Sequence, residues 1–277
     1  MISTGGHLTI LESVDSTNNY AMAQVRTGLA KHGDAFFAMA QVNGKGQRGK
    51  TWLTEPGTNI ILTLVMQPLP LLLSKQFIFS AAIALAVRDF FSHYAGEETT
   101  IKWPNDIYWR DRKAGGILIE NIIGSPDHPV RSSQFLVHSP EGPDAAIGTK
   151  NYELRTNSWH WAIVGMGINI NQTVFPEAVR NPVSLKQITG RHWDVIVLAR
   201  ELCTLVQRRY EALLAGEDIL EMYNRQLYKI GQTVKFRKGS RLFEGLVKQV
   251  NEEGLLVIQT ATEELFGFGE IEWVLSS

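Results

Sequence analysis

The sequence has 277 residues, of which 44% are hydrophobic and 20% are charged, a composition typical of a globular protein and not of a disordered or fibrous one. The 27 Lys and Arg residues nearly balance the 28 Asp and Glu residues, so the formal net charge at pH 7 is -1. We therefore expect no general attraction to nucleic acid or to an anionic membrane, and any phosphate binding must come from a local site.

The amino terminus, MISTGGHLTI, has no basic region followed by an apolar core, and the sequence contains no run of 18 apolar residues. We therefore expect a cytoplasmic protein without a membrane segment. The only cysteine, Cys203, excludes an internal disulfide and any site built from several cysteines. It lies in a segment with helical apolar spacing, which predicts that its thiol packs in the core.

The chain begins with a predicted strand at His7–Leu11 and a predicted helix that carries Ala21, Met22 and Val25. Asp15 or Ser16 is a good N-cap for this helix, and Gly28 would end it. The simplest interpretation of the residues at 16–18, Ser-Thr-Asn, is helix capping. Hydroxyl and amide groups at a helix start can also bind a neutral polar ligand such as a urea ring.

Residues 44–52, GKGQRGKTW, combine three glycines, three cations and a tryptophan. Such a segment can surround an anion with backbone and side-chain donors and offers an aromatic ring for a flat group, which suits a nucleotide. Its first six residues also match G-x-G-x-x-G, the dinucleotide-binding pattern. That pattern requires a helix directly after it and an acidic residue about 20 positions later. Here a strand-like run, IILTLVM, follows instead, so we predict an anion-binding loop between two strands.

A long amphipathic helix is predicted from Ser74 to Tyr94, with a stop at Gly96. The segment Ile101–Trp109 is expected to be a strand interrupted by Pro104, and a second strand follows in AGGILIENI. The resulting hairpin would bring together Lys102, Asn105, Asp106 and Lys113. These residues are also compatible with an ordinary turn and solvated lysines, so both interpretations stay open. The position of Lys113, just before two glycines, is suited to a cation above a ligand.

Residues 124–158 show little periodicity and are expected to form loops, with short strands at QFLVH and NYELR. A buried strand is predicted in Trp159–Asn171, and helices are predicted at Asp194–Leu214 and Asp218–Leu227. The last part of the chain contains five short alternating or apolar runs separated by turns, the pattern of a small β-barrel. We place a domain boundary near Gln226, which divides the chain into residues 1–226 and 227–277.

Six segments in this order, DSTNNYA, AQVNGKGQRGKTW, KWPNDIY, RKAGGILIE, GMGININ and the terminal β-barrel, resemble the biotin protein ligases (biotin–acetyl-CoA-carboxylase ligases). The resemblance covers nearly the whole chain outside residues 124–158. It implies an α/β (α+β) fold: a catalytic domain of the class II synthetase and lipoate ligase type, with a mixed sheet and helices, followed by a small SH3-like domain.

The resemblance also implies a reaction. The biotin carboxylate attacks the α-phosphate of Mg-ATP to give biotinyl-5'-AMP, and a lysine of a biotin carboxyl carrier protein then attacks this anhydride. Because two anions meet in the first step, preorganised cations and backbone N–H groups must offset their repulsion.

The residues that the resemblance assigns fall into three groups. The biotin site would comprise Ser16, Thr17, Asn18, Gln41, Lys45, Gly46, Gln47 and Gly116. The ATP and adenylate site would comprise Gly44, Arg48, Lys50, Trp52, Asn105, Lys113 and Asn169, with Trp52 and Asn169 facing the adenine. The catalytic residues would be Lys113, which bridges the biotin carboxylate and the α-phosphate, together with Arg48 and Asp106. Asp106 is also the candidate for binding Mg2+ or the acceptor amine.

Three features depart from the family pattern. The usual loop is GRGRxG, and its two arginines are replaced here by Lys45 and Gln47. Lysine keeps the charge but loses the two-pronged geometry, and glutamine loses the charge, so weaker retention of the adenylate is expected. Residues 124–158 replace a short hairpin. Too few residues precede the catalytic domain for the DNA-binding domain of the bifunctional members, so we expect a ligase that does not bind DNA.

The expected partner is a biotin carboxyl carrier protein of acetyl-CoA carboxylase or a related carboxylase, and the resemblance allows a homodimer. Two alternatives stay open. A lipoate protein ligase shares the fold and the adenylate chemistry, and a non-catalytic sensor of biotin or nucleotide could carry an altered loop. The retention of Lys113, Arg48 and Asp106 favours an enzyme.

Overall fold

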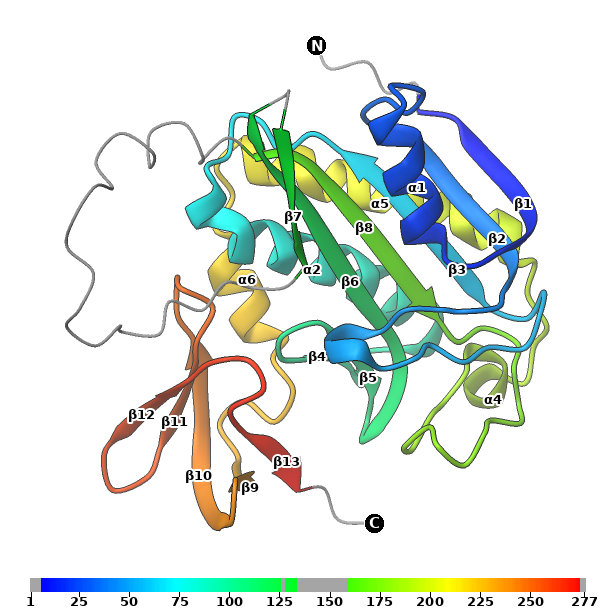
Figure 1. Ribbon diagram of the computed structural model, residues 1–277. Helices are drawn as coiled ribbons and strands as arrows, with labels where there is room; N and C mark the ends of the chain where they lie inside the picture. The colour runs from blue at the N-terminus through cyan, green and yellow to red at the C-terminus, as the bar shows by residue number, and fades with distance from the viewer. Residues whose placement is uncertain (1–5, 126–127, 134–158, 275–277) are drawn as a thin grey trace.

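The computed structural model describes residues 6–125, 128–133 and 159–274. The chain forms an eight-stranded mixed sheet with helices on both faces, followed by a separate five-stranded antiparallel sheet (Figure 1). The described helices include none that combines the length and the apolar character needed to cross a membrane. The expected α/β fold with a small C-terminal β domain is confirmed.

The elements of the large sheet and its helices have the following bounds. The strands are β1 (Leu8–Val14), β2 (Ala35–Gln41), β3 (Ile60–Met66), β4 (Thr99–Lys102), β5 (Asp106–Trp109), β6 (Arg112–Ser125), β7 (His128–Ser133) and β8 (Trp159–Ile168). Their order in the sheet is β1-β2-β3-β8-β6-β5-β4, and β7 pairs with β6 outside this path. The helices are α1 (Thr17–Arg26), α2 (Gln76–Ala95), α4 (Leu185–Thr189), α5 (Val195–Leu214) and α6 (Ile219–Arg225), with short 3-10 turns η1 (Gln47–Gly49) and η2 (Leu73–Lys75).

The two faces of the large sheet are covered differently. Helix α2 packs on one face, and α5 packs against α2 and β3 (Figure 1). The β8 residues at 162, 164, 166 and 168, all apolar, point into this main core. Helix α1 covers part of the other face with a smaller cluster that includes Met22, Val65 and Ile163. We refer to these as the α2 face and the α1 face.

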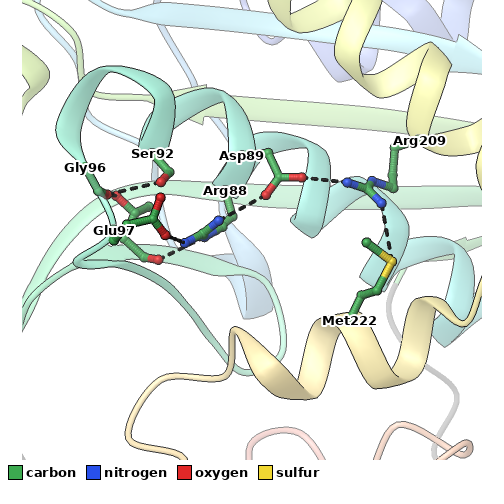
Figure 2. Close-up of polar contacts among 8 residues, drawn as sticks. Arg88, Asp89, Ser92, Gly96, Glu97, Arg209 and Met222 are labelled. Carbon is green, nitrogen blue, oxygen red and sulfur yellow. Dashed lines mark hydrogen bonds and ion pairs between the residues drawn. The ribbon is translucent and has the colours of Figure 1, made fainter.

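A polar network ties the helices of the α2 side together (Figure 2). Arg88 of α2 is buried and donates to the Thr99 carbonyl at 3.0 Å and to the Asp89 carboxylate at 3.2 Å. The same Asp89 accepts from Arg209 of α5 at 2.6 Å, and Arg209 reaches the sulfur of Met222 in α6. Because each buried charge has a partner, this network holds three helices in register without a burial penalty from an unpaired ion.

The small sheet has the order β12-β11-β10-β9-β13. Its strands are β9 (Thr233–Lys238), β10 (Arg241–Val250), β11 (Leu256–Gln259), β12 (Glu263–Phe266) and β13 (Glu272–Val274). It docks on the large domain next to the turn between β4 and β5, where Trp103 donates its indole N–H to the Gly254 carbonyl at 2.9 Å. All five predicted strands of this region are present.

Several details differ from the sequence-based expectations. Ile101–Trp109 is not one interrupted strand: the chain reverses at 103–105, so that β4 and β5 pair with each other and Lys102 lies opposite Asp106. Residues at the start of the expected loop region belong to strands β6 and β7, which form a hairpin. The strands expected at QFLVH and NYELR lie outside the described residues. Helix α2 begins at Gln76, two residues after the expected start at Ser74, and has no side-chain cap.

Cys203 lies in α5 and packs against the main core, as expected. Burial raises the pKa of its thiol to about 12, so the nucleophilic thiolate form is scarce at neutral pH. The cysteine is therefore a packing residue.

Candidate active site

The α1 face of the large sheet has a strip of uncovered backbone at three glycines, Gly116, Gly165 and Gly167, which we call the glycine strip. Gly116 of β6 pairs with Gly167 of β8, and Leu118 pairs with Gly165. A Cβ atom at Gly165 would overlap Asn18, and one at Gly167 would lie 2.5 Å from Cε2 of Trp52. The missing side chains let α1 and Trp52 approach the sheet, and they let a ligand contact the backbone.

The start of α1 lies over one end of this strip. The Thr17 amide donates to Oε1 of Gln41 at 2.7 Å, and the Asn18 side chain donates to the Leu118 carbonyl at 3.3 Å. Ser16 occupies the N-cap position with extended backbone, but its hydroxyl makes no capping bond. The expected capping role is therefore wrong for this hydroxyl. Ser16 is only 2% exposed, which leaves a buried hydroxyl beside the strip that a ligand can engage.

Residues 44–52 form a compact loop between β2 and β3, as predicted, and we call it the basic loop. Trp52 donates its backbone N–H to Gly44 at 2.9 Å, Gly46 donates to Lys50 at 2.7 Å, and Lys45 forms an isolated β-bridge with Thr51. A side chain at Gly44 would overlap the Trp52 carbonyl. The loop is thus closed on itself by backbone bonds, which brings Lys45 toward α1.

The tip of the basic loop carries three polar side chains, Gln47, Arg48 and Lys50, and each has different surroundings. Arg48, with a left-handed backbone (φ 56°), donates to the Gly269 carbonyl of the C-terminal sheet at 3.1 Å and lies 6.0 Å from the ring centre of Phe268. Gln47 lines a small cavity, and Lys50 is exposed. Arg48, which was expected at the phosphates together with Lys113, therefore contacts Gly269 and Phe268 of the C-terminal region instead.

Trp52 lies next to Gly167 and near the predicted catalytic lysine. Nζ of Lys113 is 5.8 Å from the centre of its ring, and its indole N–H is buried without a hydrogen-bond partner among the described residues. An unpaired buried donor is costly, so this N–H is a candidate contact for a ligand. Asn169, also expected at the adenine, is buried and donates its amide nitrogen to the carbonyls of Lys113 and Val183. Asn169 thus fixes the backbone around Lys113.

The β4–β5–β6 region brings the charged residues together as predicted. Nζ of Lys113 donates to Oδ1 of Asp106 at 2.6 Å, directly beside Gly116. Asn105 instead turns toward the strand and donates its side-chain amide to the Ile117 carbonyl. It holds β5 against β6 and so sets the position of Asp106.

Lys102 completes this charged group, although it was not assigned a role from the sequence. Its Nζ lies 3.1 Å from the Tyr108 hydroxyl and 5.9 Å from the ring centre of Trp273 in the C-terminal sheet. Burial lowers the pKa of Lys102 to about 8, and the nearby cations Lys113, Lys50 and Arg180 act in the same direction, while Asp106 opposes them. Several cations around one carboxylate make this region suited to a polyanion.

The group of Lys102, Asp106 and Lys113 contains one carboxylate, that of Asp106. No group of three or more His, Cys, Asp or Glu side chains that could hold a metal occurs within residues 6–125, 128–133 and 159–274. Magnesium is usually bound by one or two carboxylates together with substrate phosphates and water. Asp106 alone meets that requirement once phosphates are bound, although its pairing with Lys113 would have to adjust.

A cavity lies between Gln47, Asn105 and the β6 segment from Ile117 to Asn121, next to Gln76 and Ser80 of α2. Its volume of about 20 Å³ has room for about one water molecule, whereas ligand pockets occupy about 300–1,000 Å³. This cavity is therefore too small for a ligand of ordinary size.

Two further polar residues of the α1 face had no role in the sequence analysis. Thr63 of β3 lies opposite Gly165, and Glu120 of β6 lies two positions beyond Leu118 on the same face. Side chains alternate along a strand, so placing Gly116 at a site also places positions 118 and 120 on that face. That alternation was the signal that could have identified Glu120.

Comparison with known proteins gives a consistent result. Residues 10–130 match the model of the Biotin/lipoate A/B protein ligase family. The chain is 34% identical over 262 residues to the bifunctional ligase/repressor BirA of Escherichia coli strain K12, a match that covers 92% of this chain and 70% of that protein. It is 26% identical over 261 residues to a biotin–[acetyl-CoA-carboxylase] ligase of Paracoccus denitrificans, covering 90% of this chain and 93% of the relative.

Among solved structures, the chain resembles a biotin protein ligase from Aquifex aeolicus in complex with biotin and ATP. The TM-score is 0.71 at 20% sequence identity, and the match covers 98% of this chain and 99% of that one. This likeness extends over both sheets, so the order of the two parts is shared as well as the fold of each.

Proposed function

This chain belongs to the biotin/lipoate A/B protein ligase family, and on that premise we propose that it is a biotin protein ligase that works in two steps. It first joins the biotin carboxylate to the α-phosphate of ATP and then transfers biotin to a lysine of a biotin carboxyl carrier protein. The observation that carries the proposal is the Lys113–Asp106 pair at 2.6 Å beside the bare backbone of Gly116.

In the first step, a carboxylate oxygen of biotin attacks the α-phosphorus, the bond from that phosphorus to the bridging oxygen breaks, and pyrophosphate leaves. Two anions must approach each other, which is unfavourable without nearby positive charge. Lys113 would bridge the carboxylate and the α-phosphate, and Lys102, Lys50 and Arg48 would face the remaining phosphates. Arg48 would have to leave Gly269 to do so.

In the second step, the amine of the carrier lysine attacks the carbonyl carbon of biotinyl-5'-AMP, and AMP leaves as the bond to its phosphate oxygen breaks. The amine must lose a proton to become a nucleophile and again after the attack. Asp106 is the carboxylate nearest to Lys113 and is our candidate to accept that proton. In the first step, before pyrophosphate leaves, a bound Mg2+ would supply further charge neutralisation at the phosphates, with Asp106 as its protein ligand.

The hydrogen-bonding groups at the start of α1 favour biotin over lipoate. Thr17, Asn18 and Thr63 are buried, and the hydroxyl of Ser16 has no capping bond. The urea group of biotin can exchange hydrogen bonds with such groups, whereas the dithiolane ring of lipoate cannot. Thr17, Asn18 and Thr63 are already hydrogen-bonded to one another, so lipoate would forgo the additional hydrogen bonds that a urea group can make.

The natural acceptor is proposed to be the carrier domain of acetyl-CoA carboxylase or a related carboxylase, in keeping with the name of the Paracoccus relative.

A homodimer is proposed from the family resemblance. Light scattering at several protein concentrations tests it, and a constant monomer mass would contradict it.

The test of the function is exchange of labelled pyrophosphate into ATP, with biotin and lipoate as parallel substrates. We expect exchange with biotin and little with lipoate, and labelling of the carrier lysine when a carrier domain is added. Exchange with lipoate alone would make the protein a lipoate ligase. Exchange with neither acid would overturn the proposal and favour a non-catalytic sensor.

A further inference from the structure

Glu120 is a buried acid in the middle of the α1 face. It is 2% exposed and lies on β6, paired with Ile163 of β8 and with Ser133 of β7. A buried carboxylate is unfavourable unless it is paired or hydrogen-bonded, so its partners indicate what it is for. One of its oxygens contacts the start of α1, and the other faces the basic loop.

The first oxygen fixes the orientation of a neighbouring amide. Oε2 of Glu120 accepts from the side-chain nitrogen of Asn18 at 3.0 Å, and Oδ1 of Asn18 then faces Thr63 and accepts from its hydroxyl at 2.7 Å. A carboxylate acts only as an acceptor here, so it requires the nitrogen of Asn18 and not the oxygen. The Leu118 carbonyl accepts from the same nitrogen at 3.3 Å, so Glu120 and Leu118 together keep Asn18 from flipping.

The orientation of Asn18 in turn affects the hydroxyl groups of Thr63 and Thr17, which are hydrogen-bonded in series. The hydroxyl of Thr63 contacts Oδ1 of Asn18 at 2.7 Å and the hydroxyl of Thr17 at 2.8 Å, and the Thr17 hydroxyl in turn contacts Oε1 of Gln41 at 3.1 Å. Because Oδ1 of Asn18 can only accept, Thr63 donates its single proton there, which leaves the Thr17 hydroxyl to donate either to Thr63 or to Gln41. Thr17 then presents its backbone N–H to Oε1 of Gln41 at 2.7 Å, which turns the amide nitrogen of Gln41 the other way. Glu120 thus helps to orient Asn18 and Thr63, whereas the backbone N–H of Thr17 sets the orientation of Gln41.

The second oxygen connects this chain to the basic loop. Oε1 of Glu120 lies 4.0 Å from Nζ of Lys45, which also donates to the side-chain oxygen of Asn19 in α1. Lys45 replaces an arginine of the usual loop pattern. Glu120 and Asn19 therefore hold Lys45 of the basic loop, and the same Glu120 also binds Asn18.

We propose that Glu120 is a positioning residue that fixes the hydrogen-bond polarity of the ring-binding end of the site and thereby selects a urea-type ring. The proposal rests on the function proposed above. A glutamine at 120 would have an amide group that must face either Asn18 or Lys45. If its amide nitrogen faces Asn18, two donors oppose each other and Asn18 is held only by the Leu118 carbonyl. If the nitrogen faces Lys45, the loop loses its attractive partner.

The experiment measures the KM values for biotin and for ATP in pyrophosphate exchange by Glu120→Gln and by Thr63→Val, which breaks the chain one step further along. We expect the KM for biotin to rise about tenfold, as loss of a charge-assisted hydrogen bond implies, and the KM for ATP to change by less than about twofold. Selectivity for biotin over lipoate should fall by a similar factor. Glu12→Gln, a change of an exposed acid on β1, is the matched control and should leave both values unchanged.

Equal increases in both KM values would reduce Glu120 to a structural role and overturn the proposal, as would an unchanged KM for biotin in Glu120→Gln. Glu120→Asp keeps an acceptor-only group and should restore part of the affinity for biotin. If Glu120→Gln does not fold, Thr63→Val alone decides between these outcomes. Failure of the wild-type protein to exchange pyrophosphate with biotin would instead contradict the proposed function and not this inference.

Discussion

The two faces of the large sheet are built from the same strands but are used in different ways. On the α2 face, β8 presents Ala162, Val164, Met166 and Ile168 to a continuous apolar core. On the α1 face, the alternate positions of the same strand include two glycines, and a buried acid and hydroxyls surround them. One face gains stability from side-chain volume, and the other gives up that volume so that a ligand and the basic loop can approach the backbone.

The largest expected effect is on stability and belongs to the α2 face. Phe79 of α2 is fully buried, and Phe79→Ala should lower the free energy of unfolding by about 3–5 kcal/mol because it leaves a cavity. Urea denaturation measures this change. Adenylation by the remaining folded protein should match the wild type, and a loss of adenylation without a loss of stability would contradict the division between the two faces.

On the α1 face, the largest expected effect is on chemistry. Lys113→Ala removes a charge-assisted contact worth about 1.5–3 kcal/mol, so adenylation should slow by about ten- to more than hundredfold. Single-turnover formation of biotinyl-5'-AMP measures the rate, and Lys31→Ala, on an exposed loop, is the matched control. Adenylation near the wild-type rate would remove Lys113 from the reaction.

The glycine strip predicts an intermediate effect. In Gly167→Ala the new Cβ would lie 2.5 Å from Trp52, so the indole must shift, at a cost of about 1–3 kcal/mol. We expect a higher KM for ATP with little change in the KM for biotin, because Trp52 is the proposed adenine contact. An unchanged KM for ATP would show that the position of the indole does not matter.

The change at Gln47 should have a smaller effect, on retention of the intermediate. Gln47→Arg restores the charge of the usual loop and should slow the release of biotinyl-5'-AMP by about tenfold, as one charge-assisted hydrogen bond implies. Release is followed by trapping the free adenylate. Gln232→Arg adds the same charge at an exposed position of the C-terminal region and should have no effect. If release by Gln47→Arg equals that of the wild type, the loss of charge at 47 has no consequence for retention.

The smallest expected effect is a pH dependence. Because burial lowers the pKa of Lys102 to about 8, its charge is present below that pH and is lost as the pH rises through it. The KM for ATP should therefore rise a few-fold above pH 8. Lys102→Arg stays charged and should move this increase to higher pH, whereas an identical profile for both proteins would exclude Lys102 as its origin.

The sequence predicted most elements of the fold because their signals are local. Helices α2 and α5 are recognised from their apolar periodicity, and the five strands of the C-terminal sheet from their short alternating runs. Neither requires knowledge of the elements against which they pack. The reversal at Trp103–Asn105 was missed because Pro104 is compatible with both an extended chain and a turn. Helix α4 is only five residues long, too short for a periodic pattern.

The candidate site was only partly predictable for a different reason. Residues within a linked motif, such as Asp106 and Lys113, could be placed together because a hairpin connects them. The pairing of Glu120 with Asn18 joins residues 102 positions apart, and the contact of Arg48 with Gly269 depends on how the two sheets dock. Such contacts follow from tertiary packing and leave no trace in local spacing.

The contact between Arg48 and Gly269 also bears on which residues position 269 can accept during evolution. The two residues are 221 positions apart, Gly269 has a left-handed backbone with φ of 85°, and a Cβ there would overlap the guanidinium of Arg48. A side chain at 269 would thus displace the guanidinium of Arg48, which belongs to the basic loop of the large domain. The left-handed φ alone disfavours a side chain at 269, so glycine should be retained there in related sequences even where position 48 is not arginine.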